Sequence, residues 1–539
     1  MLNYLKAHFN RAWLLNFGGS IGVPIIFFLV VYGLMPVSDT LQFDPDEGIE
    51  LAKVLLYRQG YTLYDQIWND QPPLLTILLA HWLGVWGQSI TAARLLILGF
   101  AAVLVGAFYS TLRLNLRSRY ALAGTFGLCL TFGFLRLSVS VMRGLPALAL
   151  AMLAVYWLLL GQSQRQANSS SSEDFRRRGW WGWIAASGVC FGLSLQIKFV
   201  TLLLVPAYLA QLLGLENVFG LGKIRRDRGP IYLIHRTAPY RIILPVALWS
   251  LCGGLTFVIT GLLTDAFHPA QLIDTHLAAS QATLQREPSW LRLVMFLAQD
   301  FDYSALAGMG IWLLLRCKPA HIPTFPLYWL ITVLLVLSFH QPLWDHYSLM
   351  VLIPVVWLAT VALAQLGQTG LTLKPWKRST CSKTGVVLVM LAIALIPVKL
   401  GINAVINQQL VQASRQQAPV IAALMRHQAQ TRWLFTDLPI ASFYTNLKVL
   451  PELAVFSTKR IESGNLSNAV LLHLLQTAQP EQVLLGRYPK IQSALQPYLA
   501  AHYVRQYQQG QISLYVLKSL VETRLSMIPA VPTARPPAL

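Results

Sequence analysis

The sequence predicts an all-α bundle that crosses a membrane many times, followed by a small α/β domain, and three observations carry this prediction. The first is composition: 55% of the 539 residues are hydrophobic and only 12% are charged, with a mean hydropathy of +0.51. A typical soluble domain has about 25% charged residues, and a disordered chain needs low hydrophobicity, so both classes are excluded. The second is a series of long apolar stretches, and the third is a more polar segment that begins near residue 402.

The long apolar stretches define the membrane part. A helix needs about 20 mostly apolar residues to cross the hydrocarbon core of a bilayer. Stretches of this kind lie near 17–36, 90–112, 120–136, 143–161, 180–197, 199–214, 242–264, 294–315, 325–340, 346–366 and 384–401. The connector at Lys198 is very short. We therefore predict about 11 transmembrane helices in a domain that covers residues 1–401.

The net charge of +20 is explained by membrane orientation rather than by nucleic-acid binding. Of the 42 Lys and Arg residues, 21 lie in segments on the same side as the N-terminus, 8 lie in or beside the opposite loops, and 13 lie in residues 399–539. Cytoplasmic loops of membrane proteins carry an excess of Lys and Arg. We therefore expect a cytoplasmic N-terminus, and an odd number of spans places the C-terminus on the outer face. No nucleic-acid partner is expected.

Residues 402–525 are predicted to form a soluble extracytoplasmic α/β domain. Helical patterns alternate there with short apolar runs that are typical of strands. The helical patterns cover 419–430, 468–478 and 490–501, and the strand-like runs cover 483–485 and 512–517. The Pro-rich stretch 526–539 is expected to be a disordered tail.

Acidic residues are concentrated in the first outer loop, which we place at 37–93. Seven of the 22 Asp and Glu residues lie within 37–73, namely Asp39, Asp44, Asp46, Glu47, Glu50, Asp65 and Asp70. Asp44 is suited to cap a helix, with Pro45 in the first helical position and Glu47 completing a capping box. The residues that follow predict an amphipathic helix at the membrane surface that ends near Gly60.

Among Asp44, Asp46 and Glu47, Asp46 is the one that no helix cap requires. A carboxylate at a helix N-terminus beside the membrane is well placed to act as general base on an incoming hydroxyl, and Glu47 is the second candidate. Asp44 and Asp46 also form a D-x-D pair of the kind that holds a divalent metal ion. Helix capping explains that pair equally well, and the sequence predicts no other cofactor.

A series of short motifs occurs in a particular order along the predicted outer side. They are Asp46-Glu47, Trp68-Asn69-Asp70-Gln71-Pro72-Pro73, Arg94, Gln196-Ile197-Lys198-Phe199 and His346-Tyr347. Over roughly residues 15–400 the chain resembles the membrane glycosyltransferases of the GT-C superfamily, in particular the protein-mannosyltransferase-like and aminoarabinose-transferase-like group (glycosyltransferase family 39-like). The resemblance implies a GT-C fold in the bacterial plasma (inner) membrane. It also implies transfer of a hexose or pentose from a polyprenyl-phosphate donor to a lipid, glycan or protein acceptor on the periplasmic face, usually with inversion.

The resemblance also assigns roles to individual residues. A leaving polyprenyl phosphate needs cations or hydrogen-bond donors, and the candidates are Lys198, Arg94, His346, Gln71 and Arg143. The candidates for substrate binding are Tyr57, Trp68, Asp70 and Tyr347. A Lys or Arg near a helix end also has a simpler explanation, because such side chains extend their charge to the lipid headgroups.

Two positions depart from the pattern of these glycosyltransferases. Gln71 stands where relatives commonly have Lys before Pro-Pro, and a Gln side chain hydrogen-bonds a phosphate without carrying charge. Arg143 stands where relatives often have an acidic residue near a Pro. Either Lys198 or Arg94 supplies the missing positive charge, or the donor or the activity differs.

Two other functions are compatible with a multi-pass protein: a transporter or lipid flippase, and a non-catalytic membrane scaffold. Transporters place ionisable residues near the middle of spans and often have two related halves. Here Asp300 and Asp302 lie at the outer edge of a predicted span, and the sequence has no visible internal symmetry. A scaffold predicts no acidic cluster in the first outer loop, so the sequence favours the glycosyltransferase.

Overall fold

The computed structural model describes residues 11–167, 174–215, 240–274, 288–317, 324–369 and 379–521. Contacts between residues divide the chain into two compact units. The first contains the described parts of 1–40, 70–272 and 283–409, and the second contains those of 41–69, 273–282 and 410–539. The predicted tail at 526–539 lies outside the described residues.

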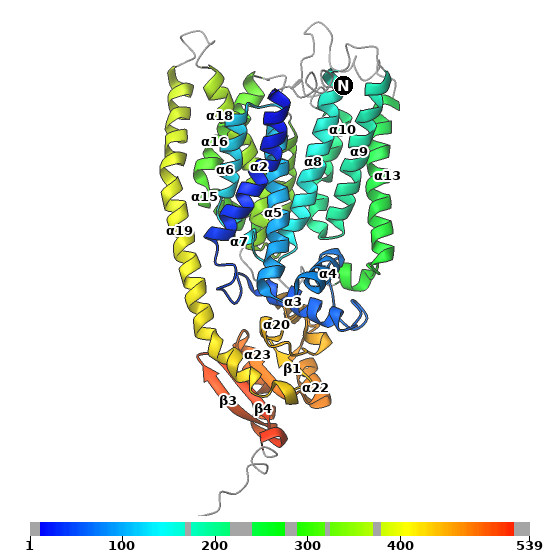
Figure 1. Ribbon diagram of the computed structural model, residues 1–539, viewed down its shortest axis with the longest axis vertical. Coiled ribbons are helices and arrows are strands. Elements are labelled where there is room, and N and C mark those ends of the chain that lie inside the picture. Colours follow the sequence, from blue (N-terminus) through cyan, green and yellow to red (C-terminus); the bar gives the residue numbers. More distant parts are fainter. Residues whose placement is uncertain are drawn as a thin grey trace, which may run out of the picture. The chain divides into compact units, whose positions relative to one another are not determined.

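The first unit consists of helices that lie side by side, and each predicted span coincides with one or two of them (Figure 1). Their bounds are α2 (Arg11–Leu34), α4 (Leu74–Trp86), α5 (Ile90–Arg113), α6 (Ser118–Cys129), α7 (Phe134–Leu137), α8 (Gly144–Ala167), α9 (Asp174–Leu195), η2 (Phe199–Leu204), α10 (Val205–Leu213), α13 (Tyr240–Leu263), α15 (Ser289–Gln299), α16 (Phe301–Cys317), α17 (Phe325–Phe339), η4 (Asp345–Tyr347), α18 (Ser348–Thr369) and the first part of α19 (Ser379–Met425). Among the described residues, five segments are long and apolar enough to cross a membrane: Ile90–Arg113, Gly144–Gln164, Ile243–Leu263, Asp345–Gly367 and Lys383–Met425. Several shorter helices are also apolar. The predicted helical bundle is confirmed.

Two predicted spans are interrupted. The stretch at 120–136 is divided into α6 and α7 because Gly133 has a φ of +78°, a left-handed conformation that glycine adopts without steric cost. The stretch at 294–315 is divided into α15 and α16 at Asp300, where the backbone φ of −118° and ψ of 47° are not helical. Apolar residues continue across the first break, and the two aspartates at the second lie in a stretch that is otherwise largely apolar, so average hydropathy did not reveal either break.

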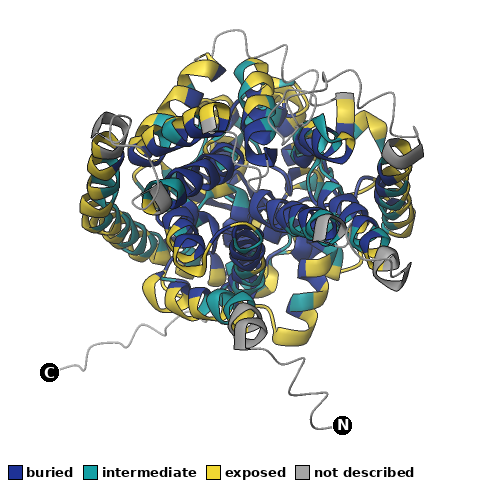
Figure 2. Ribbon diagram, turned by 90° about the horizontal axis from the view of Figure 1, so that it is seen from above, coloured by how far each residue is buried: buried dark blue, intermediate teal, exposed yellow. Residues whose placement is uncertain are grey.

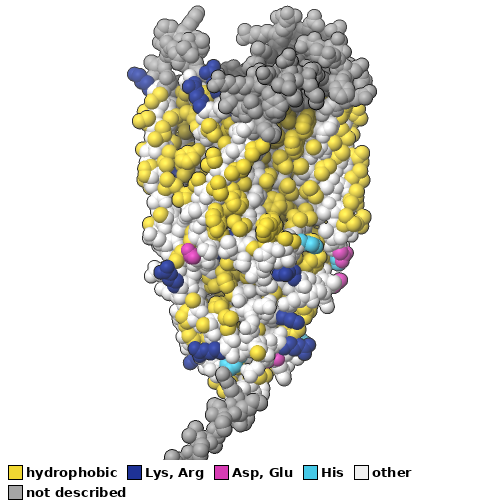
Figure 3. Space-filling model, in the orientation of Figure 1, with side chains coloured by type: hydrophobic (Ala, Val, Ile, Leu, Met, Phe, Trp, Pro, Cys, Tyr) yellow, Lys and Arg dark blue, Asp and Glu magenta, His cyan; other side chains and the backbone are white. Residues whose placement is uncertain are grey.

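Large aromatic side chains fill the interior of the first unit. Trp329, Trp357, Tyr208 and Phe325 are all fully buried. The ring centroid of Phe325 lies 5.3, 6.1 and 6.2 Å from those of Tyr208, Trp329 and Trp357, respectively. In an end-on view of the helices, buried residues lie between helices and exposed residues lie on their outer sides (Figure 2). Hydrophobic side chains cover the outside of the helices on the face in Figure 3, as expected for a bundle surrounded by lipid.

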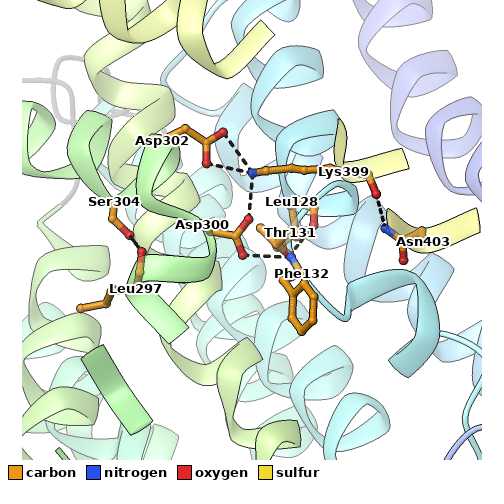
Figure 4. Close-up of polar contacts among 9 residues, drawn as sticks. All are labelled: Leu128, Thr131, Phe132, Leu297, Asp300, Asp302, Ser304, Lys399 and Asn403. Atoms are coloured by element: carbon orange, nitrogen blue, oxygen red, sulfur yellow. Dashed lines mark hydrogen bonds and ion pairs between the residues drawn. The ribbon is translucent and has the colours of Figure 1, made fainter. Parts of the chain in front are cut away.

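A buried charge cluster joins α19 to both interrupted spans (Figure 4). The Lys399 ammonium group lies 2.8 Å from Asp300 Oδ1 and 2.8 and 3.0 Å from the two carboxylate oxygens of Asp302. Asp300 Oδ2 accepts a hydrogen bond from the N–H of Phe132, between α6 and α7, at 2.9 Å. Lys399 Nζ also lies 3.9 Å from the centroid of the Tyr303 ring. Both aspartate side chains are fully buried, so the cluster fixes α19 against these breaks through a paired charge.

The C-terminal part of the second unit is an α/β domain, as predicted. Its four-stranded sheet has the order β1-β2-β4-β3, in which β1 and β2 are parallel and the other pairs are antiparallel. The strands are β1 (Leu434–Thr436), β2 (Gln482–Leu485), β3 (Tyr503–Gln509) and β4 (Ile512–Leu517), and the helices are α20 (Ile440–Thr445), α21 (Thr458–Glu462), α22 (Asn468–Ala478) and α23 (Pro489–His502). The predicted helices at 468–478 and 490–501 correspond to α22 and α23, and the one at 419–430 is largely the end of α19. The predicted strand-like runs correspond to β2 and β4, whereas β1 and β3 were not predicted.

A buried carboxylate joins the ends of the two parallel strands. Asp437 directly follows β1, and its oxygens accept backbone hydrogen bonds of 2.9 Å from each of Gly486, Arg487 and Tyr488, which follow β2. Burial raises the pKa of Asp437, and the three N–H groups partly offset this effect. The contact fixes the position of Tyr488 at this edge of the sheet.

Candidate functional site

The acidic segment of the first outer loop begins helix α3 (Pro45–Arg58), close to the predicted position. Asp44 caps the helix, because its side chain accepts a hydrogen bond from the Asp46 N–H at 3.0 Å. Glu47 is fully buried, and its carboxylate accepts a hydrogen bond from the N–H of Phe43 at 2.5 Å. In the predicted capping box, the Glu47 carboxylate would accept a hydrogen bond from the N–H of Asp44. The backbone at Asp44 is extended, and Glu47 instead accepts the N–H of Phe43, the residue before it. Asp46 contributes its backbone to the cap, and its side chain is half-buried.

A buried ion pair cross-links the segment that carries Asp46. Lys53 Nζ lies 2.8 Å from Glu50 Oε1 and 3.3 Å from Asn69 Oδ1, and all three side chains are buried. Asn69 directly follows Trp68, so this pair ties α3 to the far end of the loop. Residues 41–69 therefore form an internally cross-linked segment that carries both Asp46 and Trp68.

A groove with a volume of about 210 Å³ lies beside the α3 cap. One wall is the extended stretch 41–45, which ends one residue before Asp46. The other wall is formed by Leu410, Ala413, Ser414 and Gln417 of α19, whose spacing of three or four residues places them on one helix face. The groove offers both apolar and uncharged hydrogen-bonding groups next to the predicted base.

Lys198 and His346, which are 148 residues apart in the sequence, are neighbours in the first unit. Lys198 Nζ lies 2.9 Å from His346 Nε2 and 5.0 Å from the centroid of the Tyr347 ring. Lys198 stands at the break between α9 and η2, and His346 and Tyr347 lie in η4, before α18. The structure thus places an ammonium group, an imidazole and a phenol ring together where two helix breaks meet.

Arg143 lies in the same region, immediately before α8. Its guanidinium group donates hydrogen bonds to the Pro72 carbonyl oxygen at 3.1 Å and to Thr76 Oγ1 at 3.0 Å, and the residue is only 5% exposed. The next residue, Gly144, is close to the imidazole, because a Cβ added there would lie 3.9 Å from His346 Cδ2. Arg143 is therefore adjacent to the histidine of the pair described above.

The stretch that contains Gln71 reaches this region through its backbone. The N–H of Leu74 donates a hydrogen bond to the carbonyl oxygen of Gln196 at 3.2 Å, two residues before Lys198. Asp70 and Gln71 begin this turn and are half-buried. We refer to Arg143, Lys198 and His346 as the cationic cluster, with the turn at 70–74 beside it.

Arg94 has a different environment. It is fully buried on α5, and its Nη1 donates hydrogen bonds to the carbonyl oxygens of Val37 and Thr40 at 2.7 and 2.9 Å and to Thr40 Oγ1 at 3.0 Å. These contacts give Arg94 a structural role at the start of the first outer loop. Its role at a donor phosphate stays a prediction.

The predicted site residues fall into two groups that belong to different units. The second unit contains Asp44, Asp46, Glu47, Tyr57 and Trp68. The first unit contains the cationic cluster together with Asp70, Gln71, Arg94 and Tyr347. All the predicted cations thus lie in the first unit, and the candidate base Asp46 lies in the second.

The D-x-D pair was also predicted as a possible site for a divalent metal ion. Within the described parts of the chain, no group of three or more His, Cys, Asp or Glu side chains is arranged to hold a metal. Asp44 Oδ1 accepts the hydrogen bond that caps α3. The metal site therefore stays a prediction.

Comparison with known proteins identifies the fold. No protein-family model and no curated protein sequence matches the chain. The crystal structure of ArnT from Cupriavidus metallidurans bound to undecaprenyl phosphate matches 94% of this chain and 98% of its own, with 13% identity and a TM-score of 0.60; the apo form matches similarly, with a TM-score of 0.59. The archaeal oligosaccharyltransferase AglB from Archaeoglobus fulgidus, in complex with an inhibitory peptide and a dolichol-phosphate, matches 93% of this chain and 74% of its own, with 12% identity and a TM-score of 0.51. The chain therefore shares the fold of ArnT and AglB, as its resemblance to the GT-C superfamily implied.

Proposed function

We propose that the chain is a membrane glycosyltransferase that moves a sugar from a polyprenyl-phosphate donor to a hydroxyl acceptor on the periplasmic face of a bacterial plasma membrane. The observation that carries this proposal is the cationic cluster, in which Arg143, Lys198 and His346 gather from separate parts of the helical unit. A leaving polyprenyl phosphate needs such groups. A lipid-linked donor is further supported by the undecaprenyl phosphate and dolichol-phosphate in the solved structures of ArnT and AglB.

In the proposed reaction, Asp46 accepts the proton of the acceptor hydroxyl while the hydroxyl oxygen attacks the anomeric carbon of the sugar. The bond between that carbon and the phosphate oxygen breaks, and its electron pair remains on the phosphate. Lys198, His346 and Arg143 stabilise the negative charge, and Gln71 adds an uncharged donor. Attack opposite the leaving phosphate inverts the anomeric carbon. Glu47, already bound to a backbone N–H, orients the helix start and is the second candidate for the base.

We assign substrate binding to Trp68 and Tyr57 in the second unit and to Asp70 and Tyr347 in the first. Aromatic rings stack against the apolar faces of sugars, and carboxylates accept hydrogen bonds from sugar hydroxyls. The groove beside the α3 cap offers space for part of an acceptor next to Asp46. Its mixture of apolar and amide side chains suits a hydroxyl-bearing lipid, glycan or protein.

The proposal is tested with the full chain in vesicles of bacterial lipids, supplied with polyprenyl-phosphate donors that carry a radiolabelled hexose or pentose and with a cell-envelope extract as acceptor. We expect release of free polyprenyl phosphate and transfer of the label to the acceptor. A flippase would instead move intact donor across the bilayer, and a scaffold would leave it unchanged. Either of those results would contradict the proposal.

Replacing Lys198 with methionine should weaken use of the donor. A hydrogen bond to a charged group contributes about 1.5–3 kcal/mol, so kcat/KM for the donor should fall about 10- to 100-fold. Lys383→Met is the matched control, because Lys383 is an exposed lysine near the start of α19. An unchanged donor kcat/KM in Lys198→Met would remove this residue from the phosphate site.

A further inference from the structure

Residues 41–69 of the first outer loop belong to one compact unit with the C-terminal α/β domain, although 373 positions separate Leu41 from Ser414 in the sequence. The contacts begin at the first residue of this segment. The N–H of Leu41 donates a hydrogen bond to Ser414 Oγ at 2.6 Å, and the Leu41 carbonyl oxygen accepts one from the Tyr444 hydroxyl at 3.0 Å. Both backbone groups of Leu41 are thus held by residues of the C-terminal part.

Helix α3 makes a second contact with this domain. A Cβ added to Gly48 would lie 2.6 Å from the backbone nitrogen of Ile440, at the start of α20. Glycine at this position therefore permits the two backbones to approach closely. Gly48 is two residues after Asp46, so this contact fixes the turn of α3 that carries the proposed base.

The other end of the segment 41–69, at Trp68, is held by Arg460 of α21. The guanidinium carbon of Arg460 lies 4.4 Å from the centroid of the Trp68 ring, a cation–π contact. Arg460 is only 5% exposed, and its Nη1 donates hydrogen bonds to the carbonyl oxygens of Glu452 and Val455 at 2.5 and 3.2 Å. The cation is therefore fixed within the C-terminal domain and presented to a ring of the loop.

Asp46 itself is close to the same domain. Burial is the main cause that raises the pKa of Tyr488, and the negative charge of Asp46 adds to the effect. Tyr488 is held in turn by its backbone bond to Asp437, by a 3.1 Å contact between its hydroxyl and that of Thr458, and by stacking on Phe456. The domain therefore contacts the loop on both sides of α3, and its Tyr488 lies within electrostatic reach of the Asp46 carboxylate.

We propose that Arg460 is a positioning residue for sugar transfer: through Trp68 it holds the loop so that the C-terminal domain sets the place of Asp46. This inference rests on the proposed function, in which Asp46 is the general base. A general base must lie within about 2.6–3.2 Å of the proton that it removes, and a displacement of about 1 Å costs a rate of order 100-fold. The role therefore predicts a large effect on turnover from a residue that does not touch the reacting atoms.

The contact is suited to a selective test because Arg460 is not part of the apolar core of the domain. That core consists of residues such as Phe435, Leu453, Leu475 and Leu495. In the full chain, Arg460→Met should lower kcat about 10- to 100-fold, while the domain remains folded at the assay temperature. Arg460→Lys keeps a cation over the ring and should recover most of the loss. Arg505→Met, which removes an exposed arginine from β3, is the matched control.

A second variant addresses the same loop at a different contact. Gly48→Ala places a methyl group against the Ile440 backbone and should also lower kcat. Wild-type kcat in Arg460→Met would overturn the inference, and so would a loss that Arg460→Lys does not reverse.

Hydrogen exchange separates this inference from the proposed function, because it needs no turnover. Backbone amides in 41–69 should exchange faster in Arg460→Met than in the wild-type chain or in Arg505→Met. Unchanged exchange would overturn the positioning role even if the enzyme transfers sugar. Faster exchange in a protein that transfers no sugar would show that the contact holds the loop while the proposed function fails.

Discussion

Replacing Asp46 with asparagine should lower the rate of sugar transfer about 10²- to 10⁴-fold, the usual contribution of a general base. An asparagine side chain has nearly the same shape but cannot accept the proton. The α3 cap should persist, because Asp46 contributes to it through its backbone N–H and the accepting side chain is that of Asp44. The measurement is kcat at saturating donor, with donor binding measured separately and expected to be unchanged.

Asp44→Asn is the matched control for that substitution. It removes one negative charge from the same helix end, yet asparagine caps helices about as well as aspartate. We expect a rate close to that of the wild-type protein. Full activity in Asp46→Asn would exclude Asp46 as the base. Equal losses in both variants, together with inhibition by a chelator, would instead indicate that the D-x-D pair holds a metal ion.

The Lys399→Met variant should be destabilised by about 3–5 kcal/mol, the cost of removing one partner from a buried ion pair. Asp300 and Asp302 would then remain fully buried without the ammonium group that lies 2.8 Å from each of them. Carboxylates in such surroundings are costly unless they are paired. Equilibrium unfolding of the wild-type and variant full-length chains in mild detergent, followed over a range of denaturant concentrations, measures the difference in the free energy of unfolding.

A combined variant distinguishes charge pairing from the loss of lysine packing. If pairing explains the effect, Asp300→Asn and Asp302→Asn introduced with Lys399→Met should restore most of the lost stability, because a neutral network replaces the unpaired charges. Lys383→Met, at an exposed position of the same helix, should be neutral. Unaltered stability in Lys399→Met would mean that the cluster does not hold α19.

Local patterns in the sequence were sufficient for much of the fold. Helix α3 followed from the Asp44-Pro45 cap and the amphipathic pattern up to Gly60, and α22 and β4 followed from their apolar spacing. Strand β3 was missed because its outward residues are polar and alternate weakly with apolar ones. The breaks at Gly133 and Asp300 were missed because hydropathy does not report backbone dihedral angles.

The candidate site was predictable only in part, because its contacts are non-local. Lys198 and His346 were each identified from short motifs, but nothing in either motif indicates that their nitrogens lie 2.9 Å apart. Arg460 was not identified at all. A lone arginine in a polar domain has no local signal for a partner such as Trp68, which is almost 400 residues away in the sequence. Residue covariation among homologous chains is the signal that could have found this pair.

The exposed course of α19 predicts how this helix should tolerate substitution. Only 6% of the most apolar 18-residue stretch of this helix is buried inside the protein. Residues such as Val386, Val387 and Met390 are more than half exposed. Because lipid tails accept any apolar side chain of this kind, a saturation mutagenesis scan should find these positions freely interchangeable. Tolerance should drop abruptly at Lys399, where a neutral residue is expected to be accepted mainly when Asp300 and Asp302 change with it. In evolution, the exposed apolar part of α19 would thus drift, and within it Lys399 would coevolve with Asp300 and Asp302 at the start of α16.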